Sequence, residues 1–157
     1  MDVAHIASLF KRYTESFPQE EMIQLKIHHT ERVVADAIEI MHREHFSKDL
    51  QTAGAIAAWL HDVGRFPQFM KYRTISDRNS ENHAVLSCAE IVRLGWLDEA
   101  SPELRERVLK AVELHNVRDL PSTLSEADAK VAHVVRDADK LDIFTVLEEA
   151  IATDYLP

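Results

Sequence analysis

Apolar residues recur every three or four positions along most of the chain, which is the spacing of an α-helix with one buried face. No stretch alternates apolar and polar residues as a half-buried β-strand would. The first periodic run spans residues 3–15 and stops near Pro18. A long helix is predicted from about residue 19 to 45, with two neighbouring apolar rows: Ile23, Ile27, Val34, Ile38 and Met41 on one, and Leu25, Val33, Ala37 and Ile40 on the other.

Capping residues mark further helices along the rest of the chain. A serine side chain can accept the first backbone N–H groups of a helix, and a glycine favours its end. On this basis helices are predicted over four stretches: about 50–63 after Ser47, 80–94 with Ser80 as the cap and Gly95 at the end, Ser101-Pro102 to about His115, and Ser122 or Ser125 to about Ala152.

Residues 65–79 do not fit the helical pattern. They show no clean period and contain a proline and several basic residues. A connection of this length inside a compact domain is more often functional than idle, so we interpret it as an irregular loop that covers a substrate. Taken together, the pattern predicts an all-α protein, a single-domain bundle (residues 1–157) of about six to seven helices.

Composition narrows the classes of function. The 157 residues carry a net charge of -9, which argues against binding to duplex nucleic acid because such binding needs a broad basic surface. The single cysteine, Cys88, excludes an internal disulfide, and its apolar neighbours favour a buried structural thiol. No apolar run reaches the roughly 18 residues of a membrane span. The N-terminus lacks the apolar centre of a signal peptide, so we expect a cytoplasmic protein.

A histidine and an aspartate, His61 and Asp62, stand next to each other at the end of an apolar segment, residues 53–60. An imidazole and a carboxylate against so apolar a wall are costly without partners, and metal cations are natural partners for both. Asp62 also lies at the C-terminal, negative end of its predicted helix, where a carboxylate is unfavourable unless a cation is close. We therefore predict that both residues bind metal.

Four further candidates occupy core-facing positions on other predicted helices: His29, His83, His115 and Asp139. Taken singly, each histidine is more often a hydrogen-bonded core residue than a ligand. Together with His61 and Asp62 they form a nitrogen and oxygen ligand set that suits manganese, iron, cobalt, nickel or zinc. Asp62 can bridge two ions because it has two oxygens. We interpret the remaining histidines as solvated or locally bonded: His5, His28, His42, His45 and His133.

In their order along the chain, these residues resemble the HD-domain superfamily of metal-dependent phosphohydrolases. The matching contexts lie within a core of about residues 20–145: Lys26-Ile-His-His29-Thr-Glu-Arg32, Leu60-His-Asp-Val-Gly64 and Asp137-Ala-Asp139-Lys-Leu-Asp142. The resemblance implies an HD-domain-like helical fold. It also implies one divalent metal held by His29, His61, Asp62 and Asp139.

Relatives with two further histidines between the His-Asp pair and the last aspartate tend to hold a second metal, and His83 and His115 match that pattern. Asp137 or Asp142 could take the place of Asp139, which fits the Ala-Asp-x-Leu pattern best. One feature departs from a subgroup of the family. Residues 116–121, directly after His115, do not carry the extended Gly-Tyr-Pro signature of the cyclic-dinucleotide phosphodiesterases.

The resemblance implies hydrolysis of a small phosphorylated substrate, nucleotides included, with one or two divalent ions as cofactor. A metal-activated water would attack phosphorus in line. Asp62 and Asp142 are expected to be catalytic, Asp142 by orienting the water. The side chains expected to bind the phosphate are Arg32, Arg65 and Lys140.

Two other functions fit the same residues. A di-iron oxygenase with an HD-like fold would use a similar ligand set, and mixed-valence iron with oxygen consumption would identify it. A non-catalytic sensory or scaffold module is the second, although modules of that kind usually lack the ligands that are present here. An exposed apolar row on the first helix could support a homodimer, and no membrane partner is expected.

Overall fold

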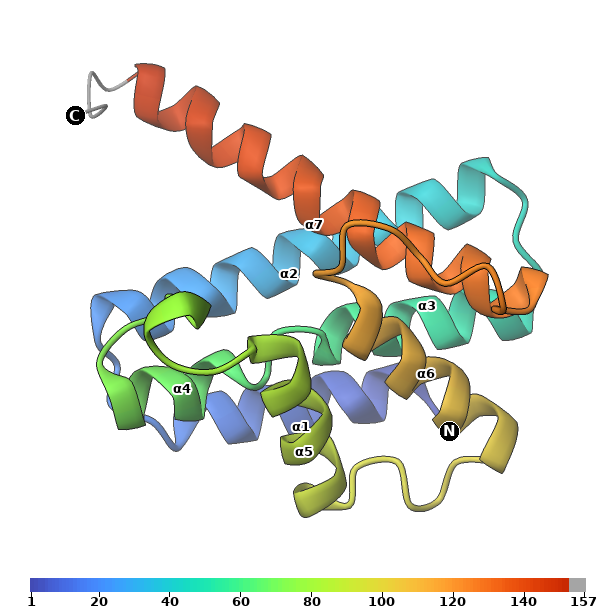
Figure 1. The fold of residues 1–157 in the computed structure, drawn as a ribbon, viewed down its shortest axis with the longest axis horizontal. Coiled ribbons are helices and arrows are strands. Elements are labelled where there is room, and N and C mark those ends of the chain that lie inside the picture. Colours follow the sequence, from blue (N-terminus) through green and yellow to red (C-terminus); the bar gives the residue numbers. More distant parts are fainter. Residues whose placement is uncertain (153–157) are drawn as a thin grey trace.

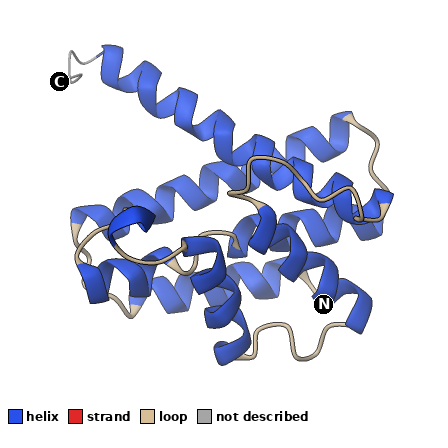
Figure 2. Cartoon of the chain, in the orientation of Figure 1, coloured by secondary structure: helices blue, strands red, loops and turns tan. Residues whose placement is uncertain are grey.

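The computed structural model describes residues 1–152, and the side chains of residues 1–146. Within these residues the protein is built from helices and connecting loops with no strand, which confirms the all-α prediction (Figures 1 and 2). The elements are α1 (Val3–Glu15), α2 (Glu21–Arg43), α3 (Lys48–Leu60), α4 (Arg65–Tyr72), the 3₁₀ turn η1 (Asp77–Asn79), α5 (His83–Leu94), α6 (Pro102–Leu114) and α7 (Glu126–Ala152).

Helix α3 lies in the middle of the bundle and packs against α1, α2, α6 and α7 (Figure 1). Small side chains make this position possible, because residues 53–58 are four alanines, one glycine and one isoleucine, and all six are buried. At Gly54 a Cβ atom would come within 3.1 Å of the Met41 Cε atom, which shows how closely α2 approaches. The helix ends at Leu60, so His61 and Asp62 follow directly inside the protein.

The hydrophobic core explains why the first helix is oriented as it is. Ile6 and Phe10 of α1 are 0% and 2% exposed and pack on α3 and α4, where Phe66 is fully buried. The apolar row that was expected to be exposed for a homodimer is therefore buried within the chain. The homodimer remains a prediction, but the apolar row of α1 no longer supports it.

The prediction of an irregular loop over residues 65–79 is wrong for its first half. Residues 65–72 form α4, and only the short turn η1 interrupts the loop that follows. Pro67 is the third residue of α4, in the first turn, where a backbone N–H would have no partner within the helix. The proline is therefore compatible with the first turn of a helix. Phe66 and Phe69 point to the core, while the basic residues of the segment remain outside it.

The caps agree with the sequence at most helix starts. The side chains of Ser47 and Ser101 accept the backbone N–H groups of Leu50 and Leu104. Helix α5 differs, because Asn82 rather than Ser80 is its cap and accepts from Ala84. Consequently His83 is the first residue of α5 and not the third.

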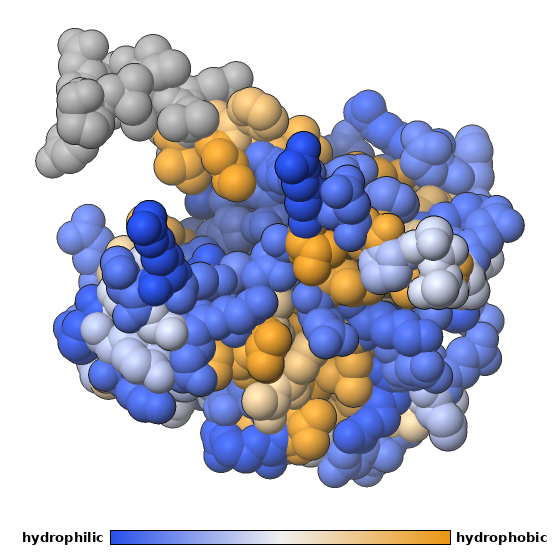
Figure 3. Space-filling view, in the orientation of Figure 1, coloured by the Kyte–Doolittle hydropathy of each residue, from blue (hydrophilic) through white to orange (hydrophobic). Residues whose placement is uncertain are grey.

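Some apolar side chains remain on the surface. Leu25 and Ile38 of α2, which belong to the predicted apolar rows, are 45% and 48% exposed. Helix α7 also exposes Ile143, Phe144 and Val146. Figure 3 shows apolar side chains gathered in places on this face of the molecule, bordered by polar ones. None of the helices within the described residues combines the length and the apolar character that crossing a membrane requires.

Candidate metal centre

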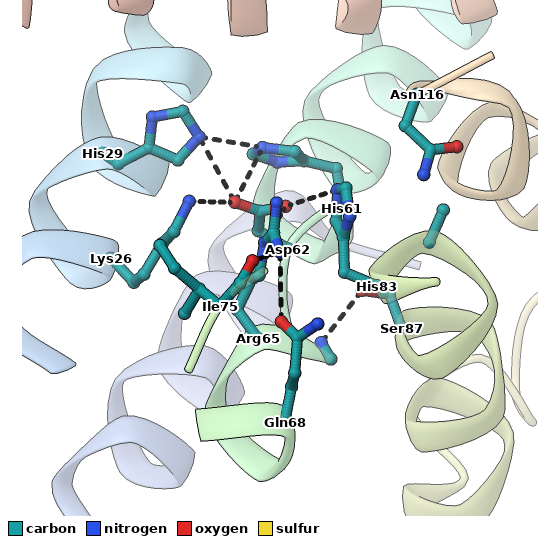
Figure 4. A network of polar contacts seen from close by, with 12 residues as sticks. Lys26, His29, His61, Asp62, Arg65, Gln68, Ile75, His83, Ser87 and Asn116 are labelled. Carbon is teal, nitrogen blue, oxygen red and sulfur yellow. Dashed lines mark hydrogen bonds and ion pairs between the residues drawn. The ribbon is translucent and has the colours of Figure 1, made fainter. Parts of the chain in front are cut away.

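Five helices bring the six predicted ligands together. His29 lies in the middle of α2, His61 and Asp62 follow α3, His83 begins α5, His115 follows α6, and Asp139 lies within α7. The four histidines of this set are buried, whereas the other five histidines of the chain are exposed. Figure 4 shows His29, His61 and His83 around the carboxylate of Asp62.

One group of donor atoms, which we call subsite 1, gathers around Oδ2 of Asp62. The Nε2 atom of His29 lies 3.3 Å from this oxygen, 3.0 Å from Oδ1 of Asp139 and 3.3 Å from Nε2 of His61. The Nε2 atom of His61 lies 3.5 Å from the same Asp139 oxygen. Two histidines and two carboxylates thus face one small volume.

A second group, subsite 2, gathers around the other oxygen of the same carboxylate. The Nε2 atoms of His83 and His115 each lie 3.5 Å from Oδ1 of Asp62 and are 2.9 Å from each other. The side chains of His115 and Asp62 are 0% and 3% exposed, so this group is almost closed to solvent. Asp62 stands between the two subsites with one oxygen toward each.

These separations fit divalent metal ions. Nitrogen and oxygen donors bound about 2.1 Å from one ion lie about 3.0–3.4 Å from each other in tetrahedral or octahedral arrangements. The donors of both subsites have nearly this spacing already. Two groups of His and Asp residues also meet the geometric requirement for an ion within the described part of the chain: His29, His61 and Asp139, and His61, Asp62 and His115.

The Nδ1 atoms of the four imidazoles, which point away from the two subsites, supply a second argument that the centre binds metal ions. Each Nδ1 atom lies 2.6–2.7 Å from an oxygen: Asp142 for His29, the Ala58 carbonyl for His61, Asp77 for His83 and the Val112 carbonyl for His115. A neutral imidazole that donates through Nδ1 presents a bare lone pair at Nε2. Two neutral rings would face each other with lone pairs at His83 and His115, whose Nε2 atoms are 2.9 Å apart, and a cation between them would remove that repulsion.

Charges in the centre shift the pKa values of its members. Burial would lower the pKa of His29, but its hydrogen bonds to Asp139 and Asp62 raise it to about 9. Burial lowers the pKa of His83 to about 4, with Arg65 adding to the effect. Burial alone would raise the pKa of Asp62, yet Lys26 and the surrounding histidines hold it well below its usual value. The bridging carboxylate is therefore ionised and ready to bind cations.

The other predicted site residues occupy different surroundings. Asp142 accepts from Nδ1 of His29 through Oδ2, and from Nε of Arg32 through Oδ1 at 2.5 Å. Arg65 donates to Asp77 at 2.8 Å and to the Ile75 carbonyl, and its Nε lies 3.9 Å from Asp62. Lys140 is exposed and is not among the residues that line the pocket at the centre. Roles in catalysis or phosphate binding stay predictions for these residues.

The structure adds Lys26, Gln68 and Asp77 to the centre, none of which was predicted from the sequence. The Nζ atom of Lys26 donates to Oδ2 of Asp62 at 2.9 Å (Figure 4). Its position three residues before His29 puts both on one face of α2, a spacing that could have identified it. Asp77 and Gln68 carry no such signal, because their roles depend on how residues 73–82 fold back onto α4.

A close approach of backbones keeps the two halves of the centre together. The Gly64 N–H donates to Oγ of Ser87 on α5 at 2.9 Å. A Cβ atom at Gly64 would lie 2.7 Å from the carbonyl carbon of Leu86 and 2.8 Å from the carbonyl oxygen of His83. Gly64 has an ordinary helical φ of -67°, so the lack of a side chain matters here for space. This contact sets His83 against Asp62.

The fold and this cluster define an all-helical protein whose buried histidines and aspartates are arranged to hold divalent metal ions. The family model of the HD domain matches residues 26–143, and the chain belongs to that family, as its sequence motifs predicted. HD domains bind divalent metals, and most of the superfamily are metal-dependent hydrolases. Neither the curated proteins nor the solved structures contain a match to this chain.

Proposed function

We propose that the protein is a metal-dependent phosphohydrolase that cleaves a small organic phosphoester with water. The observation that carries this proposal is the division of the Asp62 carboxylate between two sets of imidazole nitrogens, at distances suited to two divalent ions. Ions bound there would supply Lewis-acid chemistry, acidifying a water and neutralising charge on the phosphoryl oxygens.

The pocket at the centre has room for a small phosphoester. Its volume is about 310 Å³, and its lining combines four of the six predicted ligands (His29, Asp62, His83 and Asp139) with three cationic side chains: Lys26, Arg32 and Arg65. Each of these cations already donates to a carboxylate: Lys26 to Asp62, Arg32 to Asp142 and Arg65 to Asp77. A carboxylate oxygen can accept from a cation and still coordinate an ion. The cations can therefore face a phosphate without losing their supports.

Water is the nucleophile that fits the pocket. Among the described residues that line it, there is no serine, threonine or cysteine. Cys88 lies elsewhere, half-buried, with Sγ against the Leu109 carbonyl, and burial together with Glu113 raises its pKa to about 11. A thiol with such a pKa is almost entirely protonated at neutral pH and is a poor nucleophile.

Apolar side chains at the same pocket favour a substrate with an organic group. Leu25 of α2 and Ile143 and Val146 of α7 belong to the lining and are 45–54% exposed. They form a surface that inorganic phosphate or pyrophosphate could not use, whereas an aromatic or aliphatic ester group would cover it. A phosphomonoester with such a group is the substrate class that we propose.

The experiment is to strip the protein of metal and reload it with manganese, iron, cobalt, nickel or zinc. A panel of phosphoesters is then assayed for phosphate release. We expect activity only in the loaded protein. Asp62→Ala should abolish turnover while the circular dichroism stays helical, and His83→Ala should lower activity by loss of one ion per chain. Asp137→Ala is the matched control, because Asp137 is an exposed aspartate two residues from Asp139.

Equal activity of Asp62→Ala and the parent would reject the proposed centre. The ligand set also suits two iron ions, so the iron-loaded protein is tested for oxygen consumption with organic substrates. Oxygen uptake without phosphate release from any ester would replace the phosphohydrolase with an oxygenase. Failure to bind any of the metals in stoichiometric amount would reject both activities in favour of a non-catalytic module.

A further inference from the structure

The stretch between α4 and α5, residues 73–82, contributes one carboxylate to the metal centre. Oδ2 of Asp77 lies 2.6 Å from Nδ1 of His83 and accepts the backbone N–H of the same residue at 3.2 Å. The carboxylate thus holds both the imidazole ring and the backbone of a subsite 2 ligand. It does not touch subsite 2 itself.

The other oxygen of Asp77 ties the stretch to α4. Oδ1 accepts from Nη1 of Arg65 at 2.8 Å and from Nε2 of Gln68 at 3.0 Å. Gln68 is only 1% exposed, and its amide also donates to Oγ of Ser80 and to the Glu81 carbonyl. Residues 73–82 are therefore held mainly by polar contacts that converge on Asp77, Arg65 and Gln68. Figure 4 shows Arg65 and Gln68 next to Ile75 of this stretch.

Apolar burial contributes little to the stability of this stretch. None of residues 73–82 is buried, and Ile75 is the member that packs, partly buried, against the core. Segments with few buried apolar contacts are the ones that open locally at low free-energy cost. The support of His83 therefore lies on an element that opens more easily than the helices around it.

The other three histidines have supports of a different kind. Asp142, which holds His29, is part of the continuous helix α7, and its second oxygen is held by Arg32. His61 and His115 donate to carbonyls three residues earlier in their own chain segments. Subsite 2 is thus the subsite with a ligand whose orientation depends on a non-helical stretch.

We propose that Asp77 is a positioning residue for a metal ion in subsite 2, and that this ion and residues 73–82 stabilise each other. An outer carboxylate fixes the tautomer and the direction of a histidine ligand and strengthens its bond to the metal. By linkage, an ion that needs His83 in place favours the closed arrangement of the stretch by the same free energy. The inference rests on the metal centre of the proposed function and not on the reaction.

The first test measures metal binding alone. Zinc or manganese is titrated into the stripped protein, and the number and affinity of bound ions are measured by calorimetry and elemental analysis. In Asp77→Asn we expect one of the two ions, that of subsite 2, to bind about 10- to 100-fold less tightly, with the other unchanged. Asp98→Asn is the matched control, because Asp98 also pairs with an arginine, Arg105 at 2.8 Å, away from the centre.

The second test follows hydrogen exchange of the backbone amides in residues 73–82. Zinc should slow their exchange in the parent, and this slowing should disappear in Asp77→Asn although one ion still binds. Exchange in α3 serves as an internal reference for a folded core. Because the parent comparison needs no variant, it holds even if Asp77→Asn folds poorly.

Three results would overturn the inference. They are two ions of parental affinity in Asp77→Asn, exchange in residues 73–82 that zinc leaves unchanged in the parent, and a parent that binds a single ion at any zinc concentration. Failure of the phosphohydrolase proposal would look different. A chain with two ions and a zinc-protected stretch that releases no phosphate from any ester would reject the reaction and support the role of Asp77.

Discussion

Replacing Gly64 with alanine tests whether the contact between the α3–α4 turn and α5 holds the metal centre together. The φ and ψ of Gly64, -67° and -18°, are comfortable for alanine, so the substitution adds no backbone strain. Its effect comes from the new Cβ atom, which would lie under 3.0 Å from backbone atoms of His83, Leu86 and Ser87. Backbone atoms cannot rotate away as the end of a side chain can.

The size of the effect follows from these distances. Ordinary van der Waals contact begins near 3.4 Å, so α5 must retreat from the turn by several tenths of an ångström to about 1 Å. Overpacking of this kind costs about 1–3 kcal/mol. For a chain of this length that corresponds to a fall in Tm of roughly 2–12 °C. A metal site tolerates errors of about 0.2 Å in its ligand distances, so subsite 2 should lose its ion.

Gly54→Ala is the matched control, because the same substitution there meets a flexible side chain. The added Cβ would contact the Sδ and Cε atoms of Met41, which can adopt another rotamer. Gly54 lies inside α3, where alanine is the better helix former by about 1 kcal/mol. We expect Gly54→Ala to keep the parental metal content and a Tm near the parental value.

The assay compares thermal unfolding of the metal-free proteins and the number of zinc ions bound per chain. We expect Gly64→Ala to unfold earlier and to keep only the ion of subsite 1. If Gly64→Ala matches the parent in both Tm and metal content, the close approach of the two backbones does not position His83. The reasoning would then be refuted.

Four further predictions concern the centre and its pocket. Lys26→Met removes the cation on Asp62 and should lower kcat/KM for a phosphoester about 10- to 100-fold, measured by steady-state kinetics at fixed metal content. Because the pKa of His29 is about 9, the metal-free protein is protonated there near pH 7.5 and should release this proton on binding metal. Near pH 10, where His29 is mostly neutral already, metal binding should release fewer protons, as calorimetry in buffers of different ionisation enthalpy would show. The same raised pKa stabilises the metal-free fold below pH 6.5, and this contribution is lost as the pH rises toward 9. Leu25→Ser should raise KM several-fold for phenyl phosphate and leave that of methyl phosphate unchanged, whereas equal changes for both would contradict an apolar substrate surface.

The helices could be predicted from the sequence where apolar period and caps agree. Ser47 and Ser101 precede periodic runs, and the structure starts α3 and α6 directly after them. Local signals compete at the start of α5, where Ser80, Asn82 and Asp77 all offer oxygens. There Asn82 caps the helix, and Ser80 instead donates to the Ser76 carbonyl. Which of several nearby polar side chains acts as the cap depends on tertiary contacts that the sequence does not display.

Which histidines are buried could also be read from the sequence, because helical position determines the face on which a side chain lies. The four chosen histidines are buried and the five rejected ones are exposed. Which histidines lie next to each other could not be predicted from the sequence, because that depends on how α2, α3, α5, α6 and α7 cross. The role of Asp77 could not be predicted for a similar reason, because its position next to His83 depends on a short loop without a periodic pattern.

Charge balance in the centre explains how an acidic protein can bind a phosphorylated substrate. Four carboxylates (Asp62, Asp77, Asp139 and Asp142) face three cationic side chains (Lys26, Arg32 and Arg65), and in the metal-free state the His29 proton balances the fourth. Two divalent ions that displace this proton would leave a local surplus of about three positive charges. The net charge of -9 describes the whole chain, whereas a phosphate in this pocket meets the field of the nearest charges in a partly desolvated site. Metal content would therefore decide whether this pocket attracts or repels its substrate.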